Sequence, residues 1–427
     1  MVPSARLLRL PYGTGEAVCY VKPERRVTRL IPRPGPAPSG PAADIINRAL
    51  ANPIGSKTLA ELAAGKKNVV VLTSDHTRPV PSCLTLPPML EQIRRGSPGA
   101  KITVLIAAGC HRGSTPREMK AKFGPAFYEA ENIINHDPQD GSNLVSLGRL
   151  PSGGELIINR LAAEADLLVA DGFIEPHQFA GFSGGRKSVL PGIAALKTVL
   201  ASHNAEFTVH PKARPGSLEG NPFQTDMIQA ARTAKLAFIL NVTLTADKQI
   251  LEAVAGDMEQ AHLAGCRLVL ERCRVKAAPS PIVIASNGGY PLDQNVYQST
   301  KSIMTADLTC APNGVIIAVN ECRDGCGSES FLKNFQKAPS LTALLEDIEK
   351  RGREETIEDQ WVIQLTASIL VRRRVIMVTG APDQIIRDLR MTPAESLTGA
   401  LSMAEELVSD PMAPITLLPD AVTVAVS

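Results

Sequence analysis

The sequence contains 427 residues with a mass of 45.5 kDa, and its 45 Lys and Arg nearly balance its 43 Asp and Glu. A chain of this length can bury a sizeable core, and 44% apolar with 21% charged residues excludes disordered, collagen-like and coiled-coil classes. A net charge of +2 without blocks of like charge gives no support for a nucleic-acid partner. Because the sequence lacks a long apolar run, a signal-peptide core and any CxxC pair, we expect no membrane partner and a cytoplasmic location.

Seven short apolar runs have the length of strands and end in turn residues. They are rich in Val and Ile and lack alternation, which is typical of strands covered on both faces. Longer helical patterns lie between them and suit the crossovers of parallel sheets. The prediction is an α/β fold with two domains of mostly parallel sheets flanked by helices. The expected strands are residues 68–73, 102–107, 166–170, 237–242, 281–285, 314–319 and 374–379, and the expected helices are residues 86–95, 222–234, 248–274 and 341–350.

Two changes in composition suggest how the chain is divided. The Pro-rich stretch 31–41 favours an extended linker on the surface, because proline disrupts helices and central strands. Around residues 275–281 (VKAAPSP) a helical pattern ends and a strand begins. We therefore expect an N-terminal domain over residues 1–274 and a C-terminal domain over 280–409. Residues 410–427 are a candidate edge strand that would complete the N-terminal domain.

Polar residues with catalytic potential follow three of the expected strands. The loops are residues 74–79 (SDHTRP), 109–113 (GCHRG) and 171–187. Open α/β sheets bind ligands beyond the carboxyl ends of their strands, so these loops are candidates for a functional site. Each loop alone also has a structural interpretation, since Asp-x-Thr caps helices and a histidine between glycines is often only solvated.

The segment GFSGGRKS at residues 181–188 is close to the phosphate-binding loop GxxxxGK[ST]. Arg186 stands where that loop has its last glycine, which allows backbone N–H groups to surround a phosphate. A nucleotide-binding ATPase or kinase and a noncatalytic small-molecule-binding protein therefore remain alternatives at this point.

Residues 175–192 (EPHQFAGFSGGRKSVLPG), followed by His203 and Asn204, resemble the nickel-pincer lactate racemase family. The resemblance implies a racemase or epimerase that inverts C2 of a small 2-hydroxy acid, lactate or a related acid. Hydride transfer to a covalently held nickel-pincer nucleotide (a nickel pyridinium bis-thiocarboxylic acid mononucleotide) would give a 2-keto acid intermediate. Shorter matching segments are residues 75–79, 109–113, 210–214, 219–222, 297–301 and 321–325, and Trp361.

The resemblance also implies a role for each matching residue, in an active site between the two domains. Lys187 would tether the cofactor as a free amine, a form that the neighbouring Arg186 favours, and His203 would bind nickel. His111 and His177 would be the paired acid and base, because imidazole exchanges protons near neutrality. Enzymes of cofactor biosynthesis would be needed for activation. The remaining residues are Arg78, Tyr297, Gln298, Lys301 and Trp361 for the substrate, and Asp75, Ser183, Gly184 and Gly185 for the cofactor.

Overall fold

The computed structural model describes residues 5–33, 35, 37–245 and 247–427. The chain forms two compact units, and neither is continuous in sequence. Unit 1 comprises Met1–Arg33, Asn204–Pro211 and Cys273–Ser427, and unit 2 comprises Pro34–His203 and Lys212–Arg272. Each unit contains a sheet of six strands flanked by helices, so the predicted α/β class with two mostly parallel sheets is confirmed.

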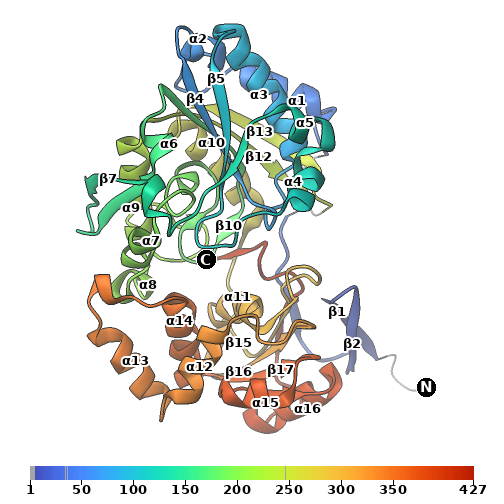
Figure 1. Cartoon of the computed structure of the whole chain (residues 1–427). Helices are drawn as coiled ribbons and strands as arrows, with labels where there is room; N and C mark the ends of the chain where they lie inside the picture. The colour runs from blue at the N-terminus through green and yellow to red at the C-terminus, as the bar shows by residue number, and fades with distance from the viewer. Residues whose placement is uncertain (1–4, 34, 36, 246) are drawn as a thin grey trace. The chain divides into compact units, whose positions relative to one another are not determined.

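The sheet of unit 2 has the strand order β13-β12-β9-β4-β5-β6 (Figure 1). All neighbouring pairs are parallel except β13 with β12. From β4 the chain adds β5 and β6 on one side, and it then returns to add β9 on the other side of β4. The strands are β4 (Asn68–Ser74), β5 (Lys101–Ala107), β6 (Ile133–Asn135), β9 (Leu167–Phe173), β12 (Leu236–Leu244) and β13 (Ile250–Gly256).

Alternate apolar residues of this sheet pack against three helices on one face. Val69 and Val71 of β4 share a buried cluster with Ile45 of α1, Leu59 of α2 and Met89 of α3. Side chains on one face recur every second residue along a strand and every three to four residues along a helix, and this spacing lets the apolar residues of both face each other. The helices of unit 2 are α1 (Ala42–Ala51), α2 (Leu59–Ala63), α3 (Ser82–Gly96), α4 (Pro116–Phe123), α5 (Pro125–Ala130), α6 (Arg160–Ala163), α7 (Leu196–Ser202), α9 (Pro222–Thr233) and α10 (Gln260–Cys273). Unit 2 also contains two hairpins, which are β7 (Leu144–Arg149) with β8 (Glu155–Asn159) and β10 (Pro176–His177) with β11 (Gly181–Phe182).

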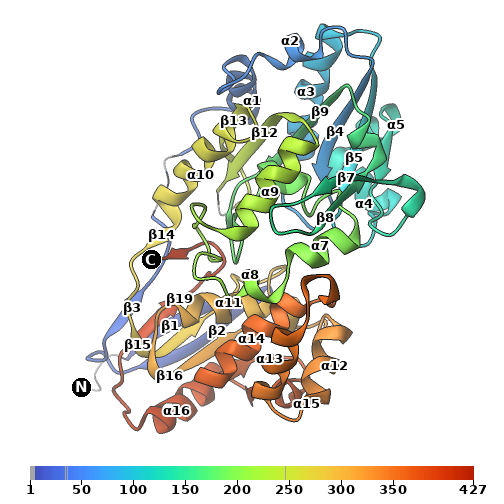
Figure 2. The same cartoon turned by 90° about the vertical axis from the view of Figure 1, so that its left-hand side faces the viewer.

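The sheet of unit 1 is entirely parallel, with the order β18-β17-β16-β15-β19-β3 (Figure 2). The pairing of β19 with both β15 and β3 brings the two ends of the chain into one sheet. The strands are β3 (Val27–Arg29), β15 (Ser280–Ala285), β16 (Cys310–Val319), β17 (Arg374–Val378), β18 (Thr392–Ala394) and β19 (Ile415–Leu418), and β14 (Arg274–Val275) pairs separately with β20 (Ala425–Val426).

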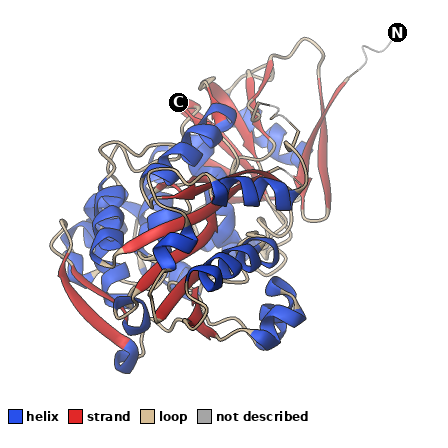
Figure 3. Cartoon of the chain, turned by 90° about the horizontal axis from the view of Figure 1, so that it is seen from above, coloured by secondary structure: helices blue, strands red, loops and turns tan. Residues whose placement is uncertain are grey.

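The two faces of this sheet bury different partners. Ile316 and Met377 belong to a cluster with residues of α11, α12 and α14, whereas Ile317 and Ile376 belong to a cluster with α16 and the hairpin β1–β2. The hairpin is the antiparallel pair near the N-terminus in Figure 3. The remaining elements are β1 (Arg6–Tyr12), β2 (Gly15–Val21), α8 (Ala205–Thr208), α11 (Val296–Asp307), α12 (Glu329–Lys337), α13 (Leu341–Lys350), α14 (Gln360–Arg372), α15 (Asp383–Asp388) and α16 (Leu397–Val408).

The structure differs from the sequence-based expectations in two places, and it agrees with the expected linker. The expected helix over residues 248–274 is instead strand β13 followed by α10, because the apolar run of β13 pairs with β12. Strands β3 and β19, expected in the N-terminal domain, pair in the sheet of unit 1. The Pro-rich stretch 31–41 contains no helix or strand in its described part, and its residues 34 and 36 lie outside the described residues. None of the described helices is long and apolar enough to cross a membrane.

We expect Ile317→Ala to lower the free energy of unfolding by about 2–5 kcal/mol, because Ile317 is fully buried in β16 and truncation leaves a cavity. Urea denaturation measures the change. Val371→Ala is the matched control, since its side chain is 51% exposed and the free energy should change by only about 0.5 kcal/mol. Equal losses in the two variants would contradict the packing of this core.

Candidate active site

The polar loops of unit 2 converge because three parallel strands end at the same edge of the sheet. The loops with Asp75, His111 and His177 follow β4, β5 and β9, respectively. Strands β4 and β9 are neighbours from which the chain continues in opposite directions across the sheet. Such a switch point leaves a crevice beyond the strand ends, where α/β proteins bind their ligands. The sequence-based expectation of a shared edge is therefore met by the topology.

Asp75 and His111 form a hydrogen-bonded pair. Nδ1 of His111 donates to Oδ2 of Asp75 over 2.6 Å, and Oδ1 of Asp75 accepts from the hydroxyl and N–H of Thr77. Burial alone would raise the pKa of Asp75, but these hydrogen bonds and the charges of His111 and Arg78 hold it well below its usual value. The ionised Asp75 fixes the proton of His111 on Nδ1, so Nε2 carries the lone pair that a general base needs. The side chain of His111 is 43% exposed, so a substrate can reach it.

His177 is held in the opposite tautomer. The N–H of Ala180 donates to Nδ1 of His177 over 3.3 Å, which places the proton of a neutral ring on Nε2. Its ring makes an edge contact with Phe179, with centroids 4.6 Å apart. In their neutral forms His111 therefore has its lone pair on Nε2, whereas His177 has its proton on Nε2.

Arg186 is fully buried beside Lys187. Its guanidinium donates to Oε1 of Gln224 and to the carbonyls of Gly184 and Ala180, and it lies 2.9 Å from Nε2 of His262. All of these partners are neutral, and burial lowers the pKa of Arg186 only to about 10, so the side chain keeps its charge at neutral pH.

Lys187 lies in an environment that disfavours its ammonium form. Burial, followed by the charges of Arg186 and Arg78, holds the pKa of Lys187 well below its usual value. Its Nζ lies 5.9 Å from the centroid of the Phe179 ring. Arg186 thus adds to the effect of burial in disfavouring the ammonium form of Lys187, and the role of Lys187 as a nucleophile stays a prediction.

His203 ends α7 and is buried against aromatic rings. Its Nδ1 lies 2.8 Å from the carbonyl of Val199 and therefore carries a proton, which leaves a lone pair on Nε2. Phe179 and Phe223 each place a ring centroid 5.3 Å from that of His203. Burial and the nearby Lys187 lower the pKa of His203 to about 3, so the imidazole is neutral, as a metal ligand must be.

The glycine loop before Lys187 is shaped by close contacts. Gly184 and Gly185 have φ values of 77° and 54°, and a Cβ on Gly184 would lie 2.6 Å from Oδ1 of Asn241. The same Oδ1 accepts from the N–H of Gly185, while the hydroxyl of Ser183 donates to the carbonyl of Phe173. These groups already have protein partners, so their expected contact with a cofactor phosphate stays a prediction.

Four of the expected substrate-binding residues belong to unit 1. Tyr297, Gln298 and Lys301 lie on the first turns of α11, and the side chain of Asn295 caps this helix through the N–H of Gln298. Trp361 lies at the start of α14, and its side chain and the hydroxyl of Tyr297 share a hydrogen bond. The structure thus groups these four residues within one unit and groups Asp75, Arg78, His111, His177, Lys187 and His203 within the other.

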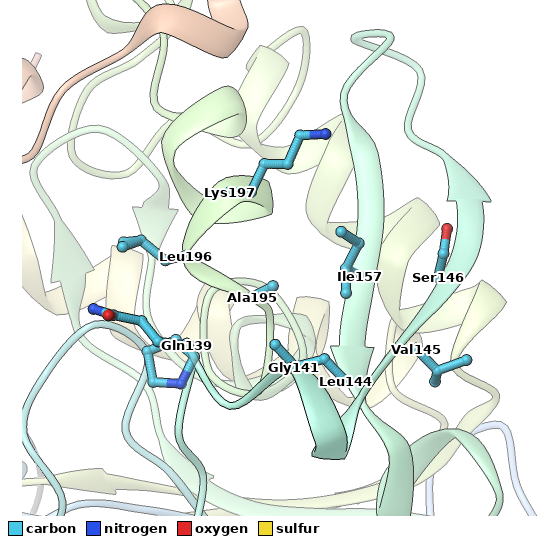
Figure 4. A pocket seen from close by; sticks show the side chains of 10 residues that line it. Gln139, Gly141, Leu144, Val145, Ser146, Ile157, Ala195, Leu196 and Lys197 are labelled. Atoms are coloured by element: carbon cyan, nitrogen blue, oxygen red, sulfur yellow. The ribbon is translucent and has the colours of Figure 1, made fainter.

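A separate open depression of about 510 Å³ lies in unit 2 between the start of α7 and the hairpin β7–β8 (Figure 4). Ala195 and Lys197 line one side, and Ser146 and Ile157 line the other. None of the expected site residues lines it. Within the described residues, no group of three or more His, Cys, Asp or Glu is arranged to hold a metal ion.

Sequence reasoning missed several residues that position the site. Phe179 touches His177 and His203 with its ring edges, and Asn241 supports the glycine loop. Gln224 and His262 surround Arg186. Asn241 carried a signal in the sequence, since it interrupts the apolar strand LAFILNVTL, but an aromatic residue such as Phe179 is indistinguishable from an ordinary core residue.

Two imidazoles and a buried lysine beside one sheet edge are groups of the kind that α/β enzymes use for proton transfer. Models of the lactate racemase N-terminal and C-terminal domains match residues 12–216 and 275–426. The lactate racemases of Thermoanaerobacterium thermosaccharolyticum and Lactiplantibacillus plantarum are 52% and 47% identical to the chain, each over 90% of both sequences. The chain therefore belongs to the lactate racemase family and is an isomerase.

Solved structures agree with this assignment. The lactate racemase apoprotein from T. thermosaccharolyticum superposes with a TM-score of 0.94 at 48% identity, covering 99% of this chain and all of the other. A Thermotoga maritima protein, 19% identical, covers 86% of this chain and 96% of its own with a TM-score of 0.65, which shows a shared fold. The family resemblance is confirmed. The ATPase and noncatalytic alternatives are wrong, and the buried Arg186 replaces the glycine that a phosphate-binding loop requires.

We expect Lys187→Met to stabilise the cofactor-free protein near pH 7. Burial and the neighbouring cations hold the pKa of Lys187 in the folded chain well below its unfolded value, so between the two values unfolding binds a proton and wild-type stability rises with pH. The advantage of the variant should shrink by up to about 1 kcal/mol per pH unit as the pH approaches the unfolded pKa of about 10.4. Urea denaturation at several pH values measures it. Lys197→Met, whose side chain is 55% exposed, is the control, and a pH-independent gain would refute the burial of a neutral amine.

Proposed function

We propose that the protein interconverts the two enantiomers of lactate or a closely related 2-hydroxy acid. The observation that carries the proposal is the complementary pair of tautomers at His111 and His177, fixed by Asp75 and by the N–H of Ala180. A racemase needs a base for one enantiomer and an acid for the other in every turnover. Lactate is the first candidate substrate because the curated relatives are lactate racemases.

The chain's residues fit a nickel-pincer nucleotide attached to Lys187. The neutral amine of Lys187 can form the covalent link, and the neutral imidazole of His203 offers Nε2 to nickel. A single imidazole suffices for a metal whose other ligands belong to the cofactor. When bound, such a cofactor supplies an acceptor and donor of hydride. The proposal also includes contact of Asp75, Ser183, Gly184 and Gly185 with the cofactor.

The remaining chemistry is proton transfer by the histidines. Nε2 of His111 takes the hydroxyl proton of one enantiomer as C2 is oxidised, and the charge of Asp75 stabilises the imidazolium that results. His177, once protonated by solvent to its imidazolium form, returns the Nε2 proton to the oxygen when the 2-keto acid is reduced on its other face. The reverse turnover exchanges the two roles. Proton exchange with solvent resets both rings, because the side chain of His111 is partly exposed.

Cationic and polar side chains are proposed to bind the substrate. The guanidinium of Arg78 suits bidentate recognition of a carboxylate, and Lys301, one turn after Gln298 on α11, adds a second cation. Tyr297 and Trp361 complete this set. Activation by enzymes of cofactor biosynthesis and a cytoplasmic location belong to the same proposal; the scattered cysteines support the latter.

The activity is tested with protein produced together with the cofactor-biosynthesis enzymes. Chiral chromatography should show that pure L-lactate and pure D-lactate each approach a racemic mixture, and intact-mass analysis should show an adduct. Lys187→Ala should lack both the adduct and the activity, whereas His203→Ala should keep the adduct and lose nickel. If adduct-bearing protein racemises another 2-hydroxy acid but not lactate, the substrate is wrong; if it turns over none of a panel, the proposed function is wrong.

The paired roles of His111 and His177 predict opposite defects in their alanine variants. Each variant should lose about 10²–10⁴-fold in racemisation, because both half-reactions occur in every turnover. Acid-quenched single turnovers should still yield 2-keto acid from one pure enantiomer, and the productive enantiomer should differ between the variants. His210→Ala, a change at a histidine that this mechanism leaves unused, is the control. Full racemase activity in either site variant would remove that histidine from the mechanism.

A further inference from the structure

The phenol of Tyr297 is held on two sides within unit 1. Its hydroxyl donates to Oδ1 of Asp359 over 2.8 Å and shares a hydrogen bond with Trp361. Because an indole N–H is only a donor, Trp361 must donate to the phenol oxygen. The ring of Tyr297 also packs edge-on against Phe331, with centroids 5.7 Å apart. The result is a chain of hydrogen bonds from Trp361 through Tyr297 to Asp359.

Burial and the charge of Asp359 both raise the pKa of Tyr297, so the hydroxyl keeps its proton at any physiological pH. The hydroxyl proton of Tyr297 lies in the hydrogen bond to Asp359, and the phenol oxygen accepts a hydrogen bond from the indole N–H of Trp361. A charged acceptor strengthens the first hydrogen bond and polarises the second. The carboxylate of Asp359 therefore orients the side chains of both Tyr297 and Trp361.

Asp359 is used in an unusual way at the start of α14. It occupies the N-cap position, and its carbonyl accepts from the N–H groups of Val362 and Ile363. An N-cap aspartate normally also caps its own helix with its carboxylate. Here the carboxylate makes no such bond and instead accepts from the hydroxyls of Tyr297 and Ser328, the latter over 2.5 Å.

The backbone of Asp359 is also strained. Its φ of 62° and ψ of 4° lie in the left-handed region, which L-residues other than glycine seldom adopt. Such a conformation persists only when the surrounding contacts determine it, and it is frequent at functional sites. In this case the conformation turns the carboxylate away from the first N–H groups of α14 and toward Tyr297.

We infer that Asp359 is a positioning residue that holds Tyr297 and Trp361 in the arrangement required to recognise the hydroxy acid. The inference rests on the proposed function, because it assigns the two aromatic residues to substrate binding. The new element of the inference is that the orientation of Tyr297 and Trp361 depends on the carboxylate of Asp359, which is not itself a substrate-binding residue. Asp359 acts through Tyr297, so removal of the Tyr297 hydroxyl should remove the effect of Asp359.

The test combines kinetics of the cofactor-loaded enzyme with NMR of its single tryptophan, whose indole N–H gives one cross-peak. Asp359→Asn should keep the fold, since asparagine tolerates the left-handed conformation. It should lower kcat/KM about 10-fold, mainly through KM, and shift the indole cross-peak. Tyr297→Phe should shift the same cross-peak, and Asp359→Asn should have no further effect on kcat/KM in the Tyr297→Phe background. Glu354→Gln removes a charge from an exposed residue five positions earlier and should change neither measurement.

An unmoved cross-peak in Asp359→Asn overturns the inference, as does an unchanged kcat/KM or a full additional loss in the double variant. A shifted cross-peak with a KM effect that disappears in the Tyr297→Phe background supports it. These outcomes are separate from the fate of the proposed function, which fails only if the loaded wild-type enzyme does not racemise a hydroxy acid.

Discussion

The burial of the Arg186 guanidinium constrains the whole site of unit 2. A buried cation without an anionic partner is costly unless its N–H groups find acceptors, and those of Arg186 reach the carbonyls of Gly184 and Ala180 and the amide oxygen of Gln224, beside the ring of His262. Two of the acceptors belong to the loop that precedes it. The loop must therefore wrap closely around the guanidinium, which explains the left-handed glycines and the contact with Asn241.

The same charge sets the protonation states around it. Burial, followed by the charge of Arg186, holds the pKa values of Lys187 and His262 well below their usual values, and burial is the main cause that lowers the pKa of His203 to about 3. The carboxylate of Asp75, in contrast, accepts a hydrogen bond from His111, whose side chain is partly exposed. The unit thus contains buried groups whose charged forms are disfavoured as well as a histidine that lies beside a carboxylate.

The sequence was informative where local pattern and structure coincide. The strand β15 and helix α13 were predicted almost to the residue, and parallel strands ending at one edge brought Asp75, His111 and His177 into adjacent loops. Pairing between distant segments was not predictable, so β13 was assigned to a helix and β19 to the wrong sheet. The role of Asp359 was also hidden, because it depends on a backbone angle and on a tyrosine 62 positions away in the sequence.

The interleaving of the two units has a consequence for synthesis of the chain. The segments of unit 2 end at Arg272, so this unit can fold while the ribosome is still adding residues. Unit 1 must wait, since β3 pairs only with β19, which ends nine residues before the C-terminus. During this interval β3 lacks its sheet partner, and the hairpin β1–β2 exposes the apolar face that later packs with β16. A strand made late, β19, therefore completes the pairing of one made early, β3.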